Sequence, residues 1–117
     1  MTRPTQEVFD SHREAIETSN FEKLAADYAE DAILVTMDGS FIGRDAILNG
    51  FFKTIFGQYP DAKINFEKTV VEDDVCLLQW SVEASNATIP RGTAVFIIRD
   101  GLIQRQGEWF EVLPTEG

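Results

Sequence analysis

The chain has 117 residues, of which 44% are hydrophobic, so it can bury the core of one domain and is too short for two. Its 20 acidic and 10 basic residues give a formal net charge of −10 at pH 7, which disfavours contact with nucleic acid. Cys76 is the single cysteine, which excludes an intrachain disulfide, and no stretch reaches membrane-spanning length. We therefore expect one soluble, cytoplasmic domain over residues 1–117 that contacts no membrane.

The N-terminal quarter of the chain predicts two helices. Apolar residues recur at three- and four-residue spacing from about Thr5 to Thr18, which predicts a helix that carries His12 on its apolar face. Residues 19–22, Ser-Asn-Phe-Glu, have the form of a capping box, in which the serine hydroxyl and the glutamate carboxylate satisfy free backbone N–H groups. A second, short helix is therefore expected through about Tyr28.

A strand and a third helix are expected next. Residues 32–37 are β-branched and apolar, which predicts a strand, and Asp38-Gly39 supplies a tight turn after it. From Gly43 onward, apolar residues at helical spacing predict a third helix that ends near Gly57. Its broad apolar stripe must pack on a large surface.

The second half of the chain alternates as strands. The expected strands run from about Ala62 to Val71, Val75 to Ala84, Thr93 to Arg99 and Leu102 to Leu113, with turns at residues 73–74 and 100–101. Because a parallel sheet would need helices interleaved with its strands, helices followed by strands favour an α+β domain.

This order of elements resembles the nuclear-transport-factor-two-like superfamily and, more narrowly, its SnoaL-like and ketosteroid-isomerase-like branch. The residues that carry the resemblance are 19–22, the Tyr-Ala-Glu-Asp-Ala run at 28–32, and residues 39–47 and 98–103. The resemblance implies a cone-shaped, cystatin-like α+β fold, with N-terminal helices packed on a curved, mixed, mostly antiparallel sheet and a pocket between them. The superfamily includes isomerases, cyclases, dehydratases, epoxide hydrolases, ligand binders and association modules, so the fold does not select a function.

Ketosteroid isomerase chemistry itself is disfavoured at two of three compared positions. The resemblance implies that His12 stands where those enzymes carry the oxyanion-hole tyrosine, Thr36 where they carry the base aspartate, and Val95 near their protonated aspartate. Threonine does not titrate near neutrality and valine has no donor, so two of the three catalytic side chains are lost.

The strand from Val75 poses a choice of orientation. One of its faces is wholly apolar (Cys76, Leu78, Trp80, Val82), and the other carries Leu77, Gln79, Ser81 and Glu83. The apolar-inward rule turns the first face toward the helices, whereas the resemblance turns Gln79, Ser81 and Glu83 toward the pocket. We adopt the second orientation, because many relatives dimerise through the outer sheet face. The resulting prediction is a homodimer through an outer patch made of Leu78, Trp80, Val82, Ala94, Phe96, Ile98 and Trp109.

The candidate site follows from that orientation. The catalytic candidates are His12, Asp38, Glu83 and Glu108, and the ligand-binding candidates are Thr36, Phe52, Phe56, Gln79, Ser81, Val95, Gln106 and Phe110. Histidine and carboxylates in a semi-enclosed pocket can shift one another's pKa values and move a proton. The alternatives are a core histidine satisfied by one hydrogen bond, an aspartate of a plain turn, and glutamates that face solvent.

These residues predict a SnoaL-like enzyme that uses general acid–base catalysis on a small, partly apolar organic molecule, as an isomerase, cyclase or dehydratase, with His12 paired to Glu83, Glu108 or Asp38. The alternative is a non-catalytic ligand-binding or association domain of the same fold. No cofactor is expected. No metal is expected either, because one histidine and dispersed carboxylates form a poor ligand set.

Overall fold

The computed structural model describes residues 3–59 and 61–114 and has a helical half followed by a strand-rich half. The helices are α1 (Thr5–Glu17), α2 (Phe21–Asp27), α3 (Arg44–Ala46), the π-helical η1 (Ile47–Phe52) and α4 (Lys53–Gln58). The strands are β1 (Tyr28–Thr36), β2 (Gly39–Ile42), β3 (Lys63–Glu72), β4 (Val75–Glu83), β5 (Ala87–Arg99), β6 (Leu102–Phe110) and β7 (Leu113–Pro114).

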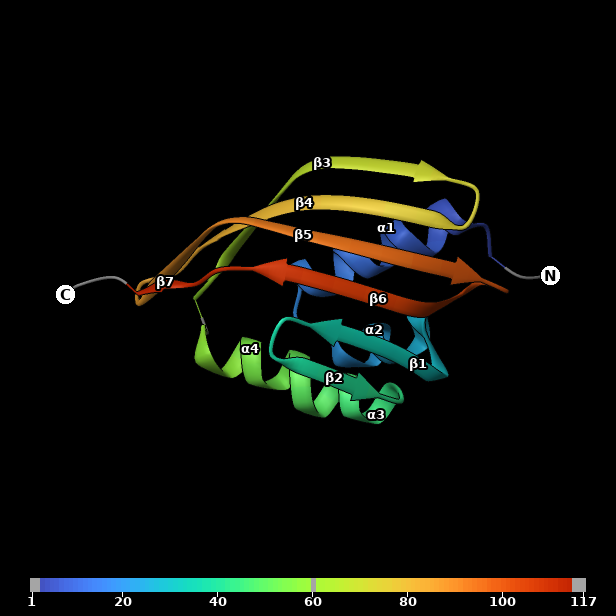
Figure 1. Cartoon of the computed structure of the whole chain (residues 1–117), viewed down its shortest axis with the longest axis horizontal. Coiled ribbons are helices and arrows are strands. Elements are labelled where there is room, and N and C mark those ends of the chain that lie inside the picture. The colour runs from blue at the N-terminus through green and yellow to red at the C-terminus, as the bar shows by residue number, and fades with distance from the viewer. Residues whose placement is uncertain (1–2, 60, 115–117) are drawn as a thin grey trace.

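All strands belong to one mixed sheet. Their order is β2-β1-β6-β5-β4-β3, with β7 paired to β5, and β1 runs parallel to β6 while the other neighbours are antiparallel. Figure 1 shows the sheet curving over the helices, with α1 behind β4 and β5 and the segment α3 to α4 along its lower side. The predicted α+β fold, N-terminal helices on a curved and mostly antiparallel sheet, is confirmed.

Three local features differ from the sequence prediction. Asn20, not its serine neighbour, caps α2, and its side-chain oxygen accepts a hydrogen bond from the Lys23 amide at 3.1 Å. Residues 39–42 form a strand of their own rather than only a turn. Strand β5 begins at Ala87 instead of Thr93, and its pairing with β4 shifts register between Trp80 and Val82.

The predicted orientation of β4 and β5 is wrong. Leu78 and Trp80 on β4 are 2% and 8% exposed, and Phe96 on β5 is 1% exposed, whereas Leu77 and Val95 are 46% and 41% exposed. The apolar face of β4 therefore packs against the helices. Burial of apolar surface decides this outcome, because the opposite orientation would leave that whole face in water.

The outer patch predicted for a homodimer is affected by the same correction. Most of its members lie in the core or on the helix side of the sheet: Leu78, Trp80, Val82, Ala94, Phe96 and Ile98. Trp109, at 50% exposed, is the member that does lie on the outer face. On β6 the predicted orientation is therefore right, and Gln106 on the opposite face is buried.

A glycine on β5 lets the Trp80 indole of β4 approach the neighbouring backbone closely. Gly92 on β5 pairs with Trp80, and a Cβ built on this glycine would lie 2.2 Å from the indole ring. The Phe110 ring packs on the same indole, with 5.5 Å between ring centroids. Gly92 thus provides the space that allows Trp80 to point inward.

Within the part of the chain that the structure describes, no helix is long and apolar enough to cross a membrane.

Candidate functional site

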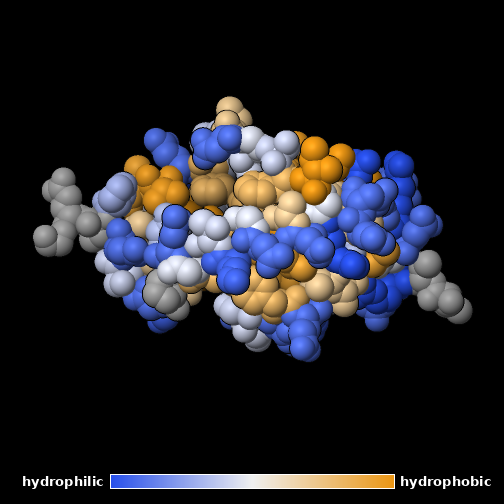
Figure 2. Space-filling model, turned by 90° about the horizontal axis from the view of Figure 1, so that it is seen from below, coloured by the Kyte–Doolittle hydropathy of each residue, from blue (hydrophilic) through white to orange (hydrophobic). Residues whose placement is uncertain are grey.

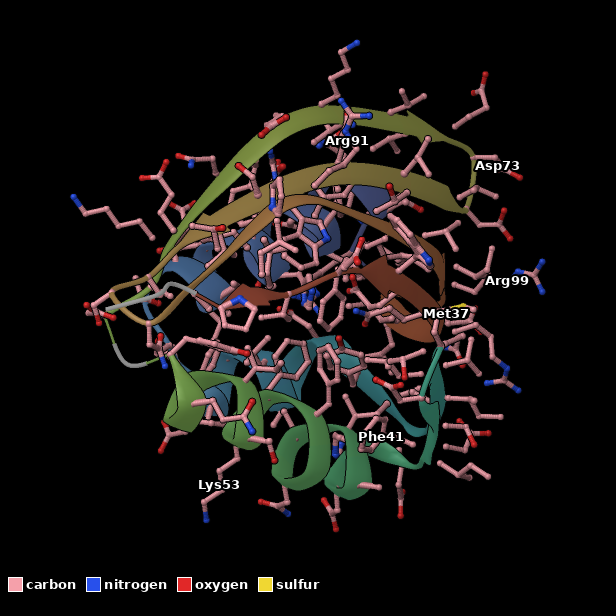
Figure 3. All side chains as sticks on the ribbon, turned by 60° about the vertical axis from the view of Figure 1, so that its left-hand side comes forward. Met37, Phe41, Lys53, Asp73, Arg91 and Arg99 are labelled. Atoms are coloured by element: carbon pink, nitrogen blue, oxygen red, sulfur yellow. The ribbon has the colours of Figure 1, made fainter. Side chains whose placement is uncertain are left out.

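A cavity of about 430 Å³ lies between the helices and the inner face of the sheet. Its walls are mainly aromatic and aliphatic, and include Phe52 and Phe56 from the helical side and Trp80, Phe96 and Phe110 from the sheet. Figure 3 shows rings and aliphatic side chains between the curved sheet and the helices, whereas Lys53 on α4 points away from that space. A volume of this size lies within the range of small-molecule sites, roughly 300–1,000 Å³.

Polar groups are distributed unevenly over this cavity. Glu17, Ser19, Lys63 and Asn65 contribute to its lining and are exposed, so they belong to its open side. Glu108 also contributes to the lining, but the Oε1 atom of its carboxyl group is buried. Glu108 therefore offers an ionisable group within a largely apolar wall.

A hydrogen-bonded chain fixes one oxygen of this carboxyl group. The Gln106 side chain donates from Nε2 to Glu108 Oε2 at 2.6 Å. The Tyr28 hydroxyl in turn donates to Gln106 Oε1. Among the described residues, Glu108 Oε1 has no hydrogen-bond partner. One carboxyl oxygen is therefore held by the protein, and the other is a buried acceptor without a hydrogen-bond partner among the described residues.

Burial raises the pKa of Glu108 to about 8. The hydrogen bond from Gln106 and the nearby indole N–H of Trp80 favour the ionised form and offset part of this rise. At pH 7 the carboxyl group is therefore mostly protonated, yet a small change in its surroundings is enough to ionise it. A group with a pKa near the working pH can act as a general acid and, once ionised, as a general base.

His12 lies in the core next to this site and makes none of the predicted carboxylate pairs. It is fully buried, neither ring nitrogen has a hydrogen-bond partner among the described residues, and it is not part of the cavity lining. The rings of Tyr28, Phe52 and Phe96 surround it, with centroid distances of 5.6, 6.0 and 5.0 Å. Burial lowers the pKa of His12 to about 3, so the imidazole is neutral at pH 7.

The predicted substitute base, Asp38, lies in the exposed turn between β1 and β2. Its backbone amide donates to Thr36 Oγ1 at 3.1 Å, and Thr36 Oγ1 donates to the Gly39 carbonyl at 3.2 Å. Neither Asp38 nor Thr36 lines the cavity. This is the turn aspartate that the sequence analysis kept as the alternative.

Four further candidates lie away from the cavity because β4 and β5 have the opposite orientation to the one predicted. They are Gln79, Ser81 and Glu83 on β4 and Val95 on β5. Their predicted place in the pocket is wrong. The structure does bring Phe52, Phe56, Glu108 and Phe110 together on the cavity wall, with Gln106 behind Glu108.

Sequence reasoning missed Tyr28, Trp80 and Phe96 as parts of the site. Trp80 and Phe96 stand on apolar strand faces, so the apolar-inward rule would have placed them correctly. Tyr28 stood within a recognised run, but the run gave no sign that its hydroxyl would meet Gln106, 78 positions further along the chain.

Other reactive groups do not add to the site. Burial raises the pKa of Cys76 to about 11, which keeps the thiol protonated and unreactive at neutral pH. Among residues 3–59 and 61–114, no cluster of three or more histidine, cysteine, aspartate or glutamate side chains could hold a metal ion.

Comparison with known proteins identifies relatives of this fold. A family model described as a SnoaL-like domain matches residues 9–106. Among curated proteins, none matches the sequence. Solved structures give strong matches at low sequence identity, which establish the fold alone.

Three of these structures illustrate the range. An NTF2-like protein of unknown function from Cytophaga hutchinsonii is 17% identical, covers 95% of this chain and 93% of its own, and has a TM-score of 0.78. A protein from Kribbella flavida assigned as a ketosteroid isomerase is 18% identical, covers 97% and 83%, and has a TM-score of 0.79. An LEH-like epoxide hydrolase from M. tuberculosis is 12% identical, covers 92% and 82%, and has a TM-score of 0.74.

Proposed function

Because this chain belongs to the SnoaL-like domain family, we propose that it is an acid–base enzyme of the isomerase, cyclase or dehydratase type, with Glu108 as its proton-transferring group. One observation carries the proposal: a carboxyl group on the wall of an apolar cavity has one oxygen held by Gln106 and the other without a protein partner among the described residues. Unsatisfied buried polar atoms of this kind are uncommon and call for a ligand or a catalytic role.

The surroundings of Glu108 favour an uncharged ligand. Ring and aliphatic walls favour a compact, partly apolar molecule, and a neutral carboxyl group can donate a hydrogen bond to a carbonyl or hydroxyl oxygen. An anionic ligand would gain little, because Lys63, the lysine of the lining, is exposed at the open side. The proposed substrate is thus a small neutral molecule with a hydrogen-bond acceptor.

A single carboxyl group can carry both proton transfers of such a reaction. In a dehydration, Glu108 would give its proton to the leaving hydroxyl group, which departs as water when the C–O bond breaks. The ionised carboxylate would then take a proton from the adjacent carbon as the double bond forms. In an isomerisation, the same group would give a proton at one position and take one at another.

Deuterium exchange tests the proposal without knowledge of the natural substrate. With 2-tetralone in D2O, we expect the protein to accelerate exchange of the hydrogens next to the carbonyl, followed by NMR. Glu108→Gln keeps a hydrogen-bonding side chain but cannot transfer the proton, so acceleration should fall by about 100-fold or more. Glu83→Gln, the same change at an exposed strand glutamate, should leave the rate within about twofold of wild type.

Non-catalytic ligand binding in the same cavity is the second candidate. It is favoured by the fact that His12 and Asp38 do not join Glu108, which leaves one titrating group on the wall instead of a pair. Thermal stabilisation by 2-tetralone without any enhancement of exchange would support this candidate and exclude the enzymatic one.

We also propose that the chain forms a homodimer through its outer sheet face, with other residues than those first predicted. Paired positions on adjacent strands place Val70, Leu77, Val95 and Val35 in one row, with Gly107 between the last two. These four side chains are 59%, 46%, 41% and 48% exposed, respectively. A row of exposed apolar side chains on a sheet can be covered by the same row of a second copy.

Light scattering tests the dimer. Leu77→Glu should yield monomers because it places a charge in the centre of the row, whereas Met37→Glu, in the exposed β1–β2 turn, should leave the dimer intact. A wild-type monomer at micromolar concentration would exclude the proposal. The cytoplasmic location expected from the lone cysteine stays a prediction.

A further inference from the structure

We infer that Tyr28 and Gln106 are positioning residues that fix the exchangeable proton of Glu108 on Oε1, the carboxyl oxygen that does not accept from Gln106 and has no hydrogen-bond partner among the described residues. The inference rests on the proposed function, because it concerns the same carboxyl group. It adds which oxygen gives the proton and which side chains determine that choice.

The first step is the direction of the Gln106 amide. A carboxamide can turn around and exchange its oxygen with its NH2 group, and either orientation could meet a carboxyl group. In the observed orientation Gln106 Nε2 donates to Glu108 Oε2, so Oε2 must offer a lone pair and cannot direct a proton at Gln106. In the reversed orientation the amide oxygen would face Oε2 and would require the proton there.

The second step is the role of Tyr28 in choosing between these orientations. Its hydroxyl is buried and donates to Gln106 Oε1. Burial, with the negative charges of Glu108 and Asp27, raises the pKa of Tyr28 well above its usual value, so the hydroxyl keeps its proton. If the amide reversed, this hydroxyl would face NH2 and would lose its acceptor. An unsatisfied buried donor is costly, so Tyr28 stabilises the observed orientation.

The consequence concerns proton transfer. With Oε2 committed as an acceptor, the neutral acid carries its proton on Oε1, and a small rotation of the carboxyl side chain, which already contributes to the cavity wall, would present that proton to a ligand oxygen. A ligand then meets one defined donor instead of two interchangeable oxygens. This arrangement gives orientation to the acid before any ligand binds, and orientation is a large part of catalytic efficiency.

Infrared difference spectra between acidic and alkaline pH test the inference on the whole chain without a ligand. The C=O stretch of the protonated Glu108 carboxyl is assigned by its loss in Glu108→Gln. In wild type this C=O group is Oε2 and accepts a hydrogen bond. In Tyr28→Phe the amide is free to reverse, so we expect the band to move to higher wavenumber or to split in two.

A second variant keeps the test decisive if Tyr28→Phe does not fold. Gln106→Met removes the donor to Oε2, so the band should again move to higher wavenumber, and the pKa of Glu108 should rise by about one unit. Gln104→Met, on the same strand but bonded to the Arg99 carbonyl, is its matched control and should change neither. An unchanged band in both folded variants, while Glu108 still titrates, would overturn the inference.

The two proposals fail separately. If the band shifts as expected but the wild type does not accelerate exchange in 2-tetralone, the enzymatic function fails and the positioning stands. If exchange depends on Glu108 but the band does not respond to Tyr28 and Gln106, the reverse holds.

Discussion

Two buried ionisable groups, His12 and Glu108, contact neighbouring parts of one core and respond to burial in opposite directions. Burial lowers the pKa of His12 to about 3 and raises that of Glu108 to about 8. Both groups are consequently neutral at pH 7, because a low-dielectric interior disfavours the charged form of either kind. The two groups differ in how far their pKa values lie from pH 7. Glu108 can change its charge near pH 7, and His12 cannot.

Their partners differ as well. His12 packs in edge-on geometry against three aromatic rings, and neither of its ring nitrogens has a hydrogen-bond partner among the described residues. Glu108 has a hydrogen-bonded chain on one side and the cavity on the other. The comparison shows that burial alone does not give an ionisable group a pKa near neutrality or a place on the cavity wall.

The largest expected effect is on the pH dependence of stability at Glu108. Its pKa rises from 4.5 to about 8 on folding, so the folded chain binds the extra proton between these values. Stability from this group is full below pH 4.5 and is lost as pH rises through 8. Between pH 5 and pH 8, the free energy of unfolding of Glu108→Gln should rise by roughly 3 kcal/mol relative to that of the wild type.

Urea unfolding at the two pH values measures this gain. Glu83→Gln, at an exposed position, should show no such pH-dependent difference. Parallel behaviour of wild type and Glu108→Gln would mean that Glu108 titrates normally, which would remove the contrast with His12.

The next effect is at His12, and its sign is opposite. Its pKa falls from 6.5 to about 3 on folding, so the unfolded chain binds the extra proton between these values. Stability is therefore lost as pH falls below 6.5. Leucine cannot be protonated, so on going from pH 8 to pH 5 the free energy of unfolding of His12→Leu should rise by about 2 kcal/mol relative to that of the wild type.

The comparison of the two pH values removes the packing cost of the new side chain, which is common to both. Unfolding followed by circular dichroism at pH 5 and pH 8 provides the measurement. A gain at pH 8 equal to that at pH 5 would show that His12 is not the source of acid sensitivity.

Exposed carboxyl groups on the surface of the molecule say less about a functional site than buried ones do. Figure 2, seen from below the view of Figure 1, shows apolar side chains on both sides of a band of hydrophilic ones. The chain carries a net charge of −10, so exposed carboxylates are common. A single exposed carboxylate such as Glu83 therefore does not indicate a functional site. A buried carboxyl group such as Glu108 is rare and therefore informative.

Much of the fold could be predicted from the sequence because periodicity and turn residues are local signals. Helix α1 was expected from Thr5 to Thr18 and runs to Glu17, and the turn at residues 73–74 separates β3 from β4 as expected. The site depended instead on which way each strand faces. That choice depends on apolar burial and on register shifts, such as the one between Trp80 and Val82, that no local sequence signal reveals.

The β6 candidates show the other side of this lesson. Glu108 and Gln106 were placed inward by the resemblance and lie inward, although Trp109 beside them is the more apolar residue. Strand β6 therefore turns polar residues inward and an apolar one outward, contrary to the apolar-inward rule. It does so at the residues proposed for the chemistry. A polar residue turned into a core against its chemical preference is a local conflict typical of functional sites.

The smallest expected change in a pKa would show whether the surroundings of Glu108 and of His12 are independent. Gly92→Ala places a methyl group against the Trp80 indole, since a Cβ there would lie 2.2 Å from the ring, so the indole must move. The nearby indole N–H of Trp80 helps to hold down the pKa of Glu108, and its displacement should raise that pKa by less than about one unit. His12 packs on the rings of Tyr28, Phe52 and Phe96 and makes no ring contact with Trp80. The loss of stability below pH 6.5 that comes from His12 should therefore be unchanged. Overpacking should lower the free energy of unfolding by about 1–3 kcal/mol at every pH, and the higher pKa of Glu108 should lower it slightly further above pH 8. Titration of Glu108 by infrared spectroscopy, together with urea unfolding from pH 4 to pH 9, separates these effects.

If the loss of stability at acidic pH changes together with the Glu108 titration, His12 and Glu108 are coupled through the aromatic core. The two groups would then have to be treated as one network and not as two independent sites.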